Sequence, residues 1–380
     1  MFSRNDTKAI KGIAILMMLF HHLAGFPDRY APGFAGFQSL WRSFTDRGMQ
    51  TYLAYFSHLC VSLFFFLGGY GLYMQWKKKR YHLLDHLKRL YKAYWRVLLL
   101  FIPIALIFFR RSDPALPALY HTYDFQDTHT LLVNVLGDLA GHSATLNKEW
   151  WFFKAYIAML MMGLLFCNVT KKNKSFVIDL LIVFLIDYLR AVVVPNMLNT
   201  TLFENSNANV YFLNFIQTDY RAVQMYLGIV FAKHNGIVRA KKELKKLRCS
   251  WIYGLLAMLL IFYFRSYIAG MFMDLVYLPC FIIAASVFLD GIPPVKKAFI
   301  FFGKHSNNMW LTHTFFCYYF YECAKIVYST RSPLLDFLIL LGMSLAASLS
   351  VNSFWKMISM LTPKLRSFFL KPQPKETPNA

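Results

Sequence analysis

YLAYFSHLCVSLFFFLGGYGLYMQ, residues 52–75, is an apolar stretch without a single Asp, Glu, Lys or Arg. As a helix it would be about 36 Å long at about 1.5 Å per residue. The hydrocarbon core of a bilayer is about 30 Å thick, so the stretch is long enough to cross it. Residues 52–75 therefore predict a transmembrane helix.

Nine other apolar segments occur along the 380-residue chain. Hydrophobic residue types make up 57% of the chain and charged types only 16%, whereas soluble domains average about 25% charged residues. This balance excludes a disordered protein and argues against an ordinary soluble enzyme. We predict an all-α, polytopic membrane bundle of about ten transmembrane helices. The further segments are 9–26, 94–109, 150–168, 176–194, 210–231, 250–268, 272–289, 305–324 and 334–357.

The rest of the chain fits one membrane domain. The run at 131–142 is apolar but too short to span, which predicts an interfacial or re-entrant piece. We expect a single domain over residues 1–360 and a cytoplasmic tail over 361–380. The end of the tail is polar and rich in Pro, so it is predicted to be disordered.

The basic residues predict the orientation of the chain. Lys and Arg number 41 against 19 Asp and Glu. With the N-terminus in the cytoplasm, 25 Lys and Arg fall on the cytoplasmic side and 9 on the outer side, and the loops at 77–92 and 233–248 carry seven each. This asymmetry is the positive-inside pattern, so we predict that both termini are cytoplasmic. Topology and contact with the anionic lipid bilayer then explain the charge, and a nucleic-acid partner is not needed.

The first predicted helix carries ionisable residues at membrane depth. Lys11 precedes His22 by eleven residues, which places them about 16 Å apart on one helix face. The adjacent His21 points about 100° away. Intramembrane ionisable residues usually serve a function, and an imidazole can act as a general base near neutral pH. The alternatives are that Lys11 is a snorkelling anchor and that the histidines bond to neighbouring helices.

Several established site patterns are missing from the sequence. The six cysteines form no Cys-x-x-Cys pair, and no zinc-ligand spacing occurs, so no metal site is predicted. There is no phosphate-binding G-x-x-x-x-G-K-[ST] loop, no H-E-x-x-H and no G-x-S-x-G. The other polar residues within the apolar runs would also suit a transporter.

Five short motifs nevertheless occur in a definite order. They are Lys11 with His22, Phe65–Tyr70, Arg89–Trp95, Glu149–Phe152, and Gly303–Ser306 with His313. Together they resemble the acyltransferase-3 family of bacterial membrane proteins, over about residues 4–360. Lys11 stands where the family has Arg, Gly68 where Ser is usual and Lys92 where Pro is usual.

This resemblance implies a multi-pass O-acyltransferase of the bacterial plasma membrane. The family moves an acyl group from a cytoplasmic acyl-coenzyme A, acetyl-coenzyme A above all, to a surface, exported or lipid-linked glycan. The donor is a co-substrate, and no permanently bound cofactor is expected. The alternatives are a multi-pass transporter of a sugar or organic acid, and an inactive family member. The expected roles are His22 as general base or acyl carrier, Lys11, Arg89 and Lys92 as donor-binding cations, and Glu149, Trp150, His313 and His21 as acceptor or pocket residues.

Overall fold

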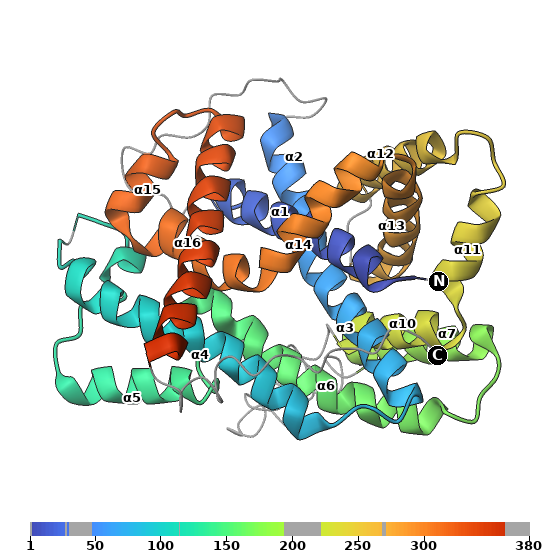
Figure 1. The fold of residues 1–380 in the computed structure, drawn as a ribbon, viewed down its shortest axis with the longest axis horizontal. Coiled ribbons are helices and arrows are strands. Elements are labelled where there is room, and N and C mark those ends of the chain that lie inside the picture. The colour runs from blue at the N-terminus through green and yellow to red at the C-terminus, as the bar shows by residue number, and fades with distance from the viewer. Residues whose placement is uncertain are drawn as a thin grey trace.

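The described chain is built from helices alone. The computed structural model describes residues 2–26, 29, 48–113, 115–193, 222–267 and 271–361. This confirms the predicted all-α class (Figure 1). The helices are α1 Arg4–Ala24, α2 Gly48–Ser57, α3 Leu59–Lys77, α4 Leu83–Phe108, η2 Ala118–His121, α5 Thr128–Leu139, η3 Lys148–Trp150, α6 Trp151–Thr170, α7 Phe176–Tyr188, η4 Leu189–Val193, α10 Ala222–Lys233, α11 Gly236–Leu244, α12 Ser250–Tyr267, α13 Met271–Gly291, α14 Pro293–Thr314, η5 Phe315–Tyr319, α15 Tyr321–Val327 and α16 Pro333–Leu361.

Six helical stretches within the described ranges are long and apolar enough to cross a membrane. They correspond to six of the predicted spans, and they define a multi-pass membrane protein. The spans predicted at 176–194 and 250–268 form the shorter helices α7 and α12. Residues 210–221 of another predicted span, and 362–380 of the predicted tail, lie outside the described residues. The six stretches are Arg4–Ala24, Thr51–Lys77, Leu83–Phe108, Lys148–Thr170, Met273–Gly291 and Pro333–Leu361.

Two predicted boundaries change in the structure. The span at 305–324 is interrupted: α14 passes into the π-helical turn η5, and the chain leaves helical geometry at Phe320 before α15 begins. The span at 94–109 starts earlier, because α4 begins at Leu83. Arg89 and Lys92 therefore lie on a helix rather than in a loop.

Helices α1 and α14 pack directly against each other near the centre of the molecule (Figure 1). A Cβ atom on Gly12 of α1 would collide with the carbonyl oxygen of Phe299, and one on Gly303 of α14 would collide with that of Lys8. Small residues of this kind let two membrane helices approach backbone to backbone. The close approach fixes the relative positions of the side chains further along both helices.

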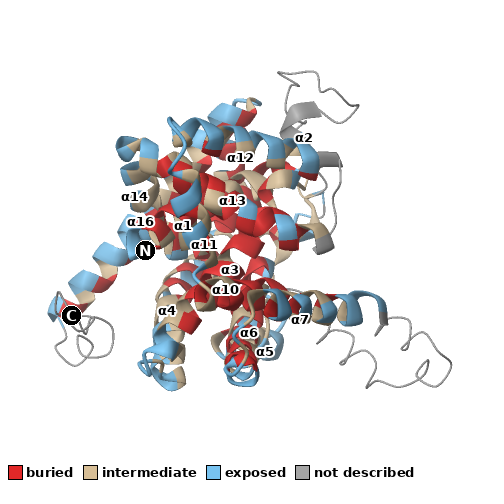
Figure 2. Cartoon of the chain, turned by 90° about the vertical axis from the view of Figure 1, so that its right-hand side faces the viewer, coloured by how far each residue is buried: buried red, intermediate tan, exposed pale blue. Residues whose placement is uncertain are grey.

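A second close pair is formed by α3 and α10. Cβ atoms on Gly69 and Gly228 would collide with the carbonyl oxygens of Met225 and Phe66, respectively. Figure 2 shows buried segments of α3, α10 and α13 in the middle of the molecule. The two glycine-mediated pairs thus make a rigid centre.

A cluster of charges fastens the beginning of α1. Lys296 of α14 forms ion pairs with both Asp6 and Asp290, and Lys241 of α11 lies 2.8 Å from Asp290. Burial alone would lower the pKa of Lys296, but its hydrogen bonds to the two carboxylates raise it. The start of α1 is therefore held by α11, α13 and α14 together.

Candidate active site

Two histidines from the close pair of helices are joined by a hydrogen bond. His22 Nδ1 of α1 lies 2.7 Å from His313 Nε2 of α14. The other ring nitrogen of His313, Nδ1, lies 2.8 Å from the carbonyl oxygen of Trp310 and 3.1 Å from that of Met309. A carbonyl oxygen only accepts, so His313 Nδ1 carries a proton and donates it.

This arrangement determines the tautomer of His22. In a neutral His313 the protonated Nδ1 leaves Nε2 as an acceptor. His22 Nδ1 must then donate to it, which leaves His22 Nε2 with a free lone pair. The pair therefore presents one basic nitrogen, and His313 orients it.

The π turn that follows His313 provides further contacts around this pair. Tyr318 donates its hydroxyl hydrogen to the carbonyl oxygen of His22, and Tyr319 accepts a hydrogen bond from the backbone N–H of Lys148 at 2.7 Å. Such π turns often occur at functional sites. Here the turn directs Tyr318 toward α1 and Tyr319 toward η3. The interruption of the predicted span therefore positions two tyrosines beside the histidine pair.

His22 lines a cavity of about 520 Å³. His21 and His58 line it as well, with ring centroids 5.1 Å apart. His21 Nδ1 lies 2.8 Å from the carbonyl oxygen of Ala54, so this nitrogen donates and the ring is held against α2. The cavity is lined by Met18, His21, His22, Gly25, Phe26, Arg29, Tyr55, His58, Val61, Ser62, Glu149, Trp151, Phe152, Arg265, Asp274 and Trp310.

The charged residues of this cavity occur as ion pairs. Arg29 pairs with Glu149, and the Arg29 guanidinium lies 4.2 Å from the ring centroid of Phe26. Arg265 meets both carboxylate oxygens of Asp274, at 2.7 and 3.0 Å. Each charge is thus neutralised locally, which reduces the cost of placing it within the bundle.

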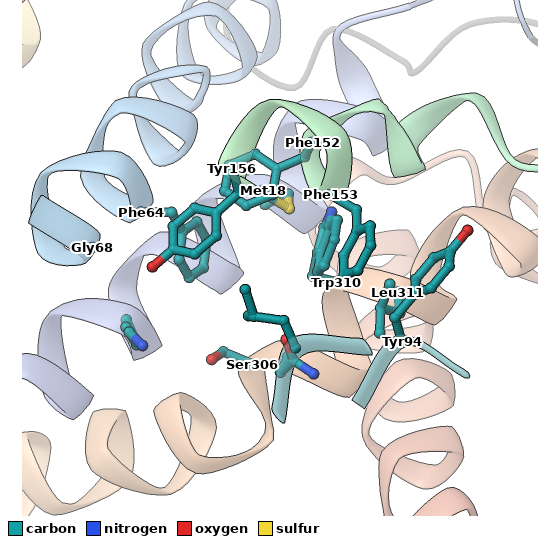
Figure 3. Close-up of a pocket in the computed structure, with 13 residues that line it drawn as sticks. Met18, Phe64, Gly68, Tyr94, Phe152, Phe153, Tyr156, Ser306, Trp310 and Leu311 are labelled. Carbon is teal, nitrogen blue, oxygen red and sulfur yellow. The ribbon is translucent and has the colours of Figure 1, made fainter. Parts of the chain in front are cut away.

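Lys11 lines a smaller cavity of about 120 Å³. Figure 3 shows this cavity with Met18, Phe152 and Trp310 on its wall. Within the described part of the chain, Lys11 has no ion pair and no hydrogen bond, and Ser306 and Asn307 supply polar groups beside it. A half-buried ammonium without a counter-charge favours an anionic ligand. The lining residues are Lys11, Met18, Phe64, Gly68, Leu90, Tyr94, Phe152, Phe153, Tyr156, Ser306, Asn307, Trp310 and Leu311.

The structure brings most of the predicted site residues together. His22, His21 and Glu149 line the larger cavity, and His313 is fully buried directly behind His22. Lys11 lines the smaller cavity. His22 and Lys11, which the sequence places on one face of α1, therefore line two adjoining cavities.

Besides the buried His313, three predicted residues line neither cavity. Trp150 is buried and donates its Nε1 hydrogen to the carbonyl oxygen of Leu311 at 3.1 Å, so it supports the wall. Arg89 is exposed and Lys92 half-buried on α4. Leu90, the chain neighbour of Arg89 on α4, lines the smaller cavity.

Several residues of the larger cavity are not evident from the sequence. By sequence Arg29 counts only as an outer charge, although it pairs with Glu149 across 120 positions. Arg265 and Asp274 stand in or beside apolar runs, which is the available signal, but their pairing depends on how α12 meets α13. His58 lies at the junction of α2 and α3, where only the fold brings it to His21.

The fold and the site together define a multi-pass membrane protein with a hydrogen-bonded histidine pair beside a cavity among its helices. The chain belongs to the acyltransferase-3 family, because the model of that family, described as an acyltransferase domain, matches residues 6–352. This confirms the resemblance predicted from the five motifs. No curated protein and no solved structure matches the chain.

Proposed function

We propose that this protein is a membrane O-acyltransferase that moves an acetyl or other short acyl group from a cytoplasmic acyl-coenzyme A to a hydroxyl of a cell-surface or exported glycan. The observation that carries the proposal is the basic Nε2 of His22 in a cavity that adjoins the Lys11 cavity. The proposal includes ten spans in a bacterial plasma membrane with both termini cytoplasmic. Lys11 then faces the side that supplies the donor.

The spacing on α1 supports a coenzyme A thioester as donor. Lys11 and His22 are eleven residues apart on one continuous helix, hence about 16 Å. An extended pantetheine arm reaches about 14 Å from its phosphate to its sulfur, by the reach of a chain with similar bonds. A phosphate held by Lys11, with Arg89 nearby, therefore brings the thioester to the vicinity of His22.

His22 then acts as the base of the transfer. Its Nε2 takes the proton of the acceptor hydroxyl while the hydroxyl oxygen attacks the thioester carbonyl. The C–O bond forms, the C–S bond breaks, and the proton passes from His22 to the departing thiolate. His313 accepts the Nδ1 hydrogen throughout and stabilises the imidazolium. The alternative route, an acyl group carried on the same Nε2, would leave labelled protein when no acceptor is present.

The walls of the larger cavity suit a carbohydrate acceptor. Phe26, Tyr55 and Trp151 offer aromatic faces to a sugar ring, and the two ion pairs offer hydrogen-bond donors and acceptors to its hydroxyls. A cavity with apolar faces and a few directed polar groups is the usual form of a small-ligand site. The acceptor hydroxyl would thus be held beside His22.

Donor turnover tests the proposed function. Purified protein in detergent is incubated with acetyl-coenzyme A labelled in the acetyl group, with and without a crude surface-glycan fraction. We expect label on the glycan. Folded protein that neither transfers nor hydrolyses acetyl, succinyl or longer thioesters would contradict the proposal and favour a transporter or an inactive member.

Replacing Lys11 with alanine is expected to weaken donor binding at least tenfold, because the phosphate loses a charge-assisted partner. Lys11→Arg restores the family's usual residue and adds a bidentate fork, so it should bind the donor at least as tightly as wild type. Calorimetric titration with coenzyme A measures both effects. Lys8→Ala is the matched control, since Lys8 lines neither cavity. Equal affinities for Lys11→Ala and Lys8→Ala would remove Lys11 from the donor site.

Replacing His313 with leucine is expected to lower kcat 10- to 1,000-fold, with a small change in KM, because His22 is free to adopt the wrong tautomer. His313→Asn keeps an acceptor for the His22 Nδ1 hydrogen and should recover part of the rate. The pH dependence of kcat distinguishes orientation from packing, because the acidic limb reports deprotonation of His22 and only loss of the hydrogen bond shifts it. An unchanged pH profile in His313→Leu would argue against this role.

A further inference from the structure

Three residues line both cavities. Met18 of α1, Phe152 of α6 and Trp310 of α14 are common to the Lys11 cavity and the His22 cavity. All three are labelled together in Figure 3. They therefore form the shared wall between the Lys11 cavity and the His22 cavity.

Two members of this wall are held firmly. The rings of Phe152 and Trp310 meet edge to face, with centroids 5.1 Å apart. Phe152 also contacts the rings of Phe65 and Tyr156, at centroid distances of 4.8 and 5.7 Å. Trp310 is tied to the histidine pair through its backbone, because its carbonyl oxygen accepts from His313 Nδ1. The aromatic part of the wall is thus braced by neighbours.

Met18 is the adaptable member. Its side chain is 3% exposed and unbranched, with rotatable bonds that let it change shape at little cost. Met18 takes no part in the ring contacts that hold Phe152 and Trp310. The separation of the two cavities at this point depends on the volume of the Met18 side chain.

We propose that Met18, Phe152 and Trp310 form a partition that selects the acyl group. This inference rests on the proposed function. The thioester enters from the Lys11 cavity. Its carbonyl reaches His22 only where the side chains of the partition move apart. A two-carbon acetyl group passes, and each additional methylene is resisted by the Met18 side chain. The closed partition also keeps water of the larger cavity from the thioester until the acceptor is in place.

The partition is tested with Met18→Ala in the purified full-length protein. Rates of transfer from acetyl- and hexanoyl-coenzyme A are compared, together with hydrolysis by water when no acceptor is present. We expect the hexanoyl-to-acetyl rate ratio to rise at least tenfold, because one methylene at a fitted wall changes rates by about 10-fold or more. Hydrolysis, in which water replaces the acceptor hydroxyl and releases the free acid and the thiol, should rise several-fold.

Met17→Ala is the matched control. Met17 is the adjacent methionine of the same helix, packs against the core and lines neither cavity. Trp310→Phe is the second variant, since it shrinks the partition while leaving the backbone carbonyl bound to His313. A ratio that stays at the wild-type value in both partition variants, or rises equally in Met17→Ala, overturns the partition. The wild-type acetyl rate tests the proposed function separately, and its absence would overturn both.

Discussion

Replacing His22 with alanine is expected to reduce acyl transfer by a factor of 100 to 10,000, the usual contribution of a positioned general base. His22 lines the larger cavity, and its Nδ1 lies 2.7 Å from the imidazole of His313, so its Nε2 is the nitrogen left for the acceptor hydroxyl. The loss should appear in kcat, because Lys11 still binds the donor. Initial rates with labelled acetyl-coenzyme A and glycan measure it.

His305→Ala provides the control for this loss. His305 is another α14 histidine, bonded through Nδ1 to the Ser348 hydroxyl at 3.0 Å, and it lines neither cavity. It should retain near wild-type rates. His22→Ala protein that elutes as a single folded species and still acylates glycan at more than a tenth of the wild-type rate would refute the catalytic assignment.

The second large effect concerns folding. Gly12→Val is expected to abolish stable folding, because its Cβ would overlap the backbone carbonyl of Phe299. A backbone atom is not moved out of the way by a change of rotamer. Ordinary overpacking costs about 1–3 kcal/mol, and separating two helix backbones costs more. Heating the detergent-solubilised protein and measuring the soluble monodisperse fraction tests this expectation.

Gly342→Ala serves as the comparison for that experiment. Gly342 lies within α16, and a Cβ there would meet nothing within 4 Å. Alanine should therefore be neutral or slightly stabilising in this helix. A wild-type melting temperature for Gly12→Val would show that α1 and α14 do not need this close approach.

The membrane-spanning helices and the shared helix face of Lys11 and His22 could be predicted from the sequence for a physical reason. Apolar length and helical periodicity are local properties of the chain, and they suffice to place Lys11 and His22 on one face of α1. The ion pairs Arg29–Glu149 and Arg265–Asp274 depend on contacts between helices, which no local pattern encodes. The role of His313 also requires the fold, because its partner lies 291 positions away.

The interrupted span shows another limit of local patterns. Phe315–Tyr319 contains no charged residue, no Pro and no Gly, so the sequence predicts an unbroken helix there. The structure places a π turn and a break in this stretch because Tyr318 and Tyr319 bond to the backbone of His22 and Lys148. The interruption is a tertiary effect.

Helix α1 carries both Lys11 and His22 and so fixes the distance between them. In the proposed reaction, the distance between the phosphate end and the acyl end of the donor is set by one hydrogen-bonded backbone. A change in the position of a neighbouring helix would leave that distance unaltered. The alignment of the thioester would then not depend on the shape of the acceptor.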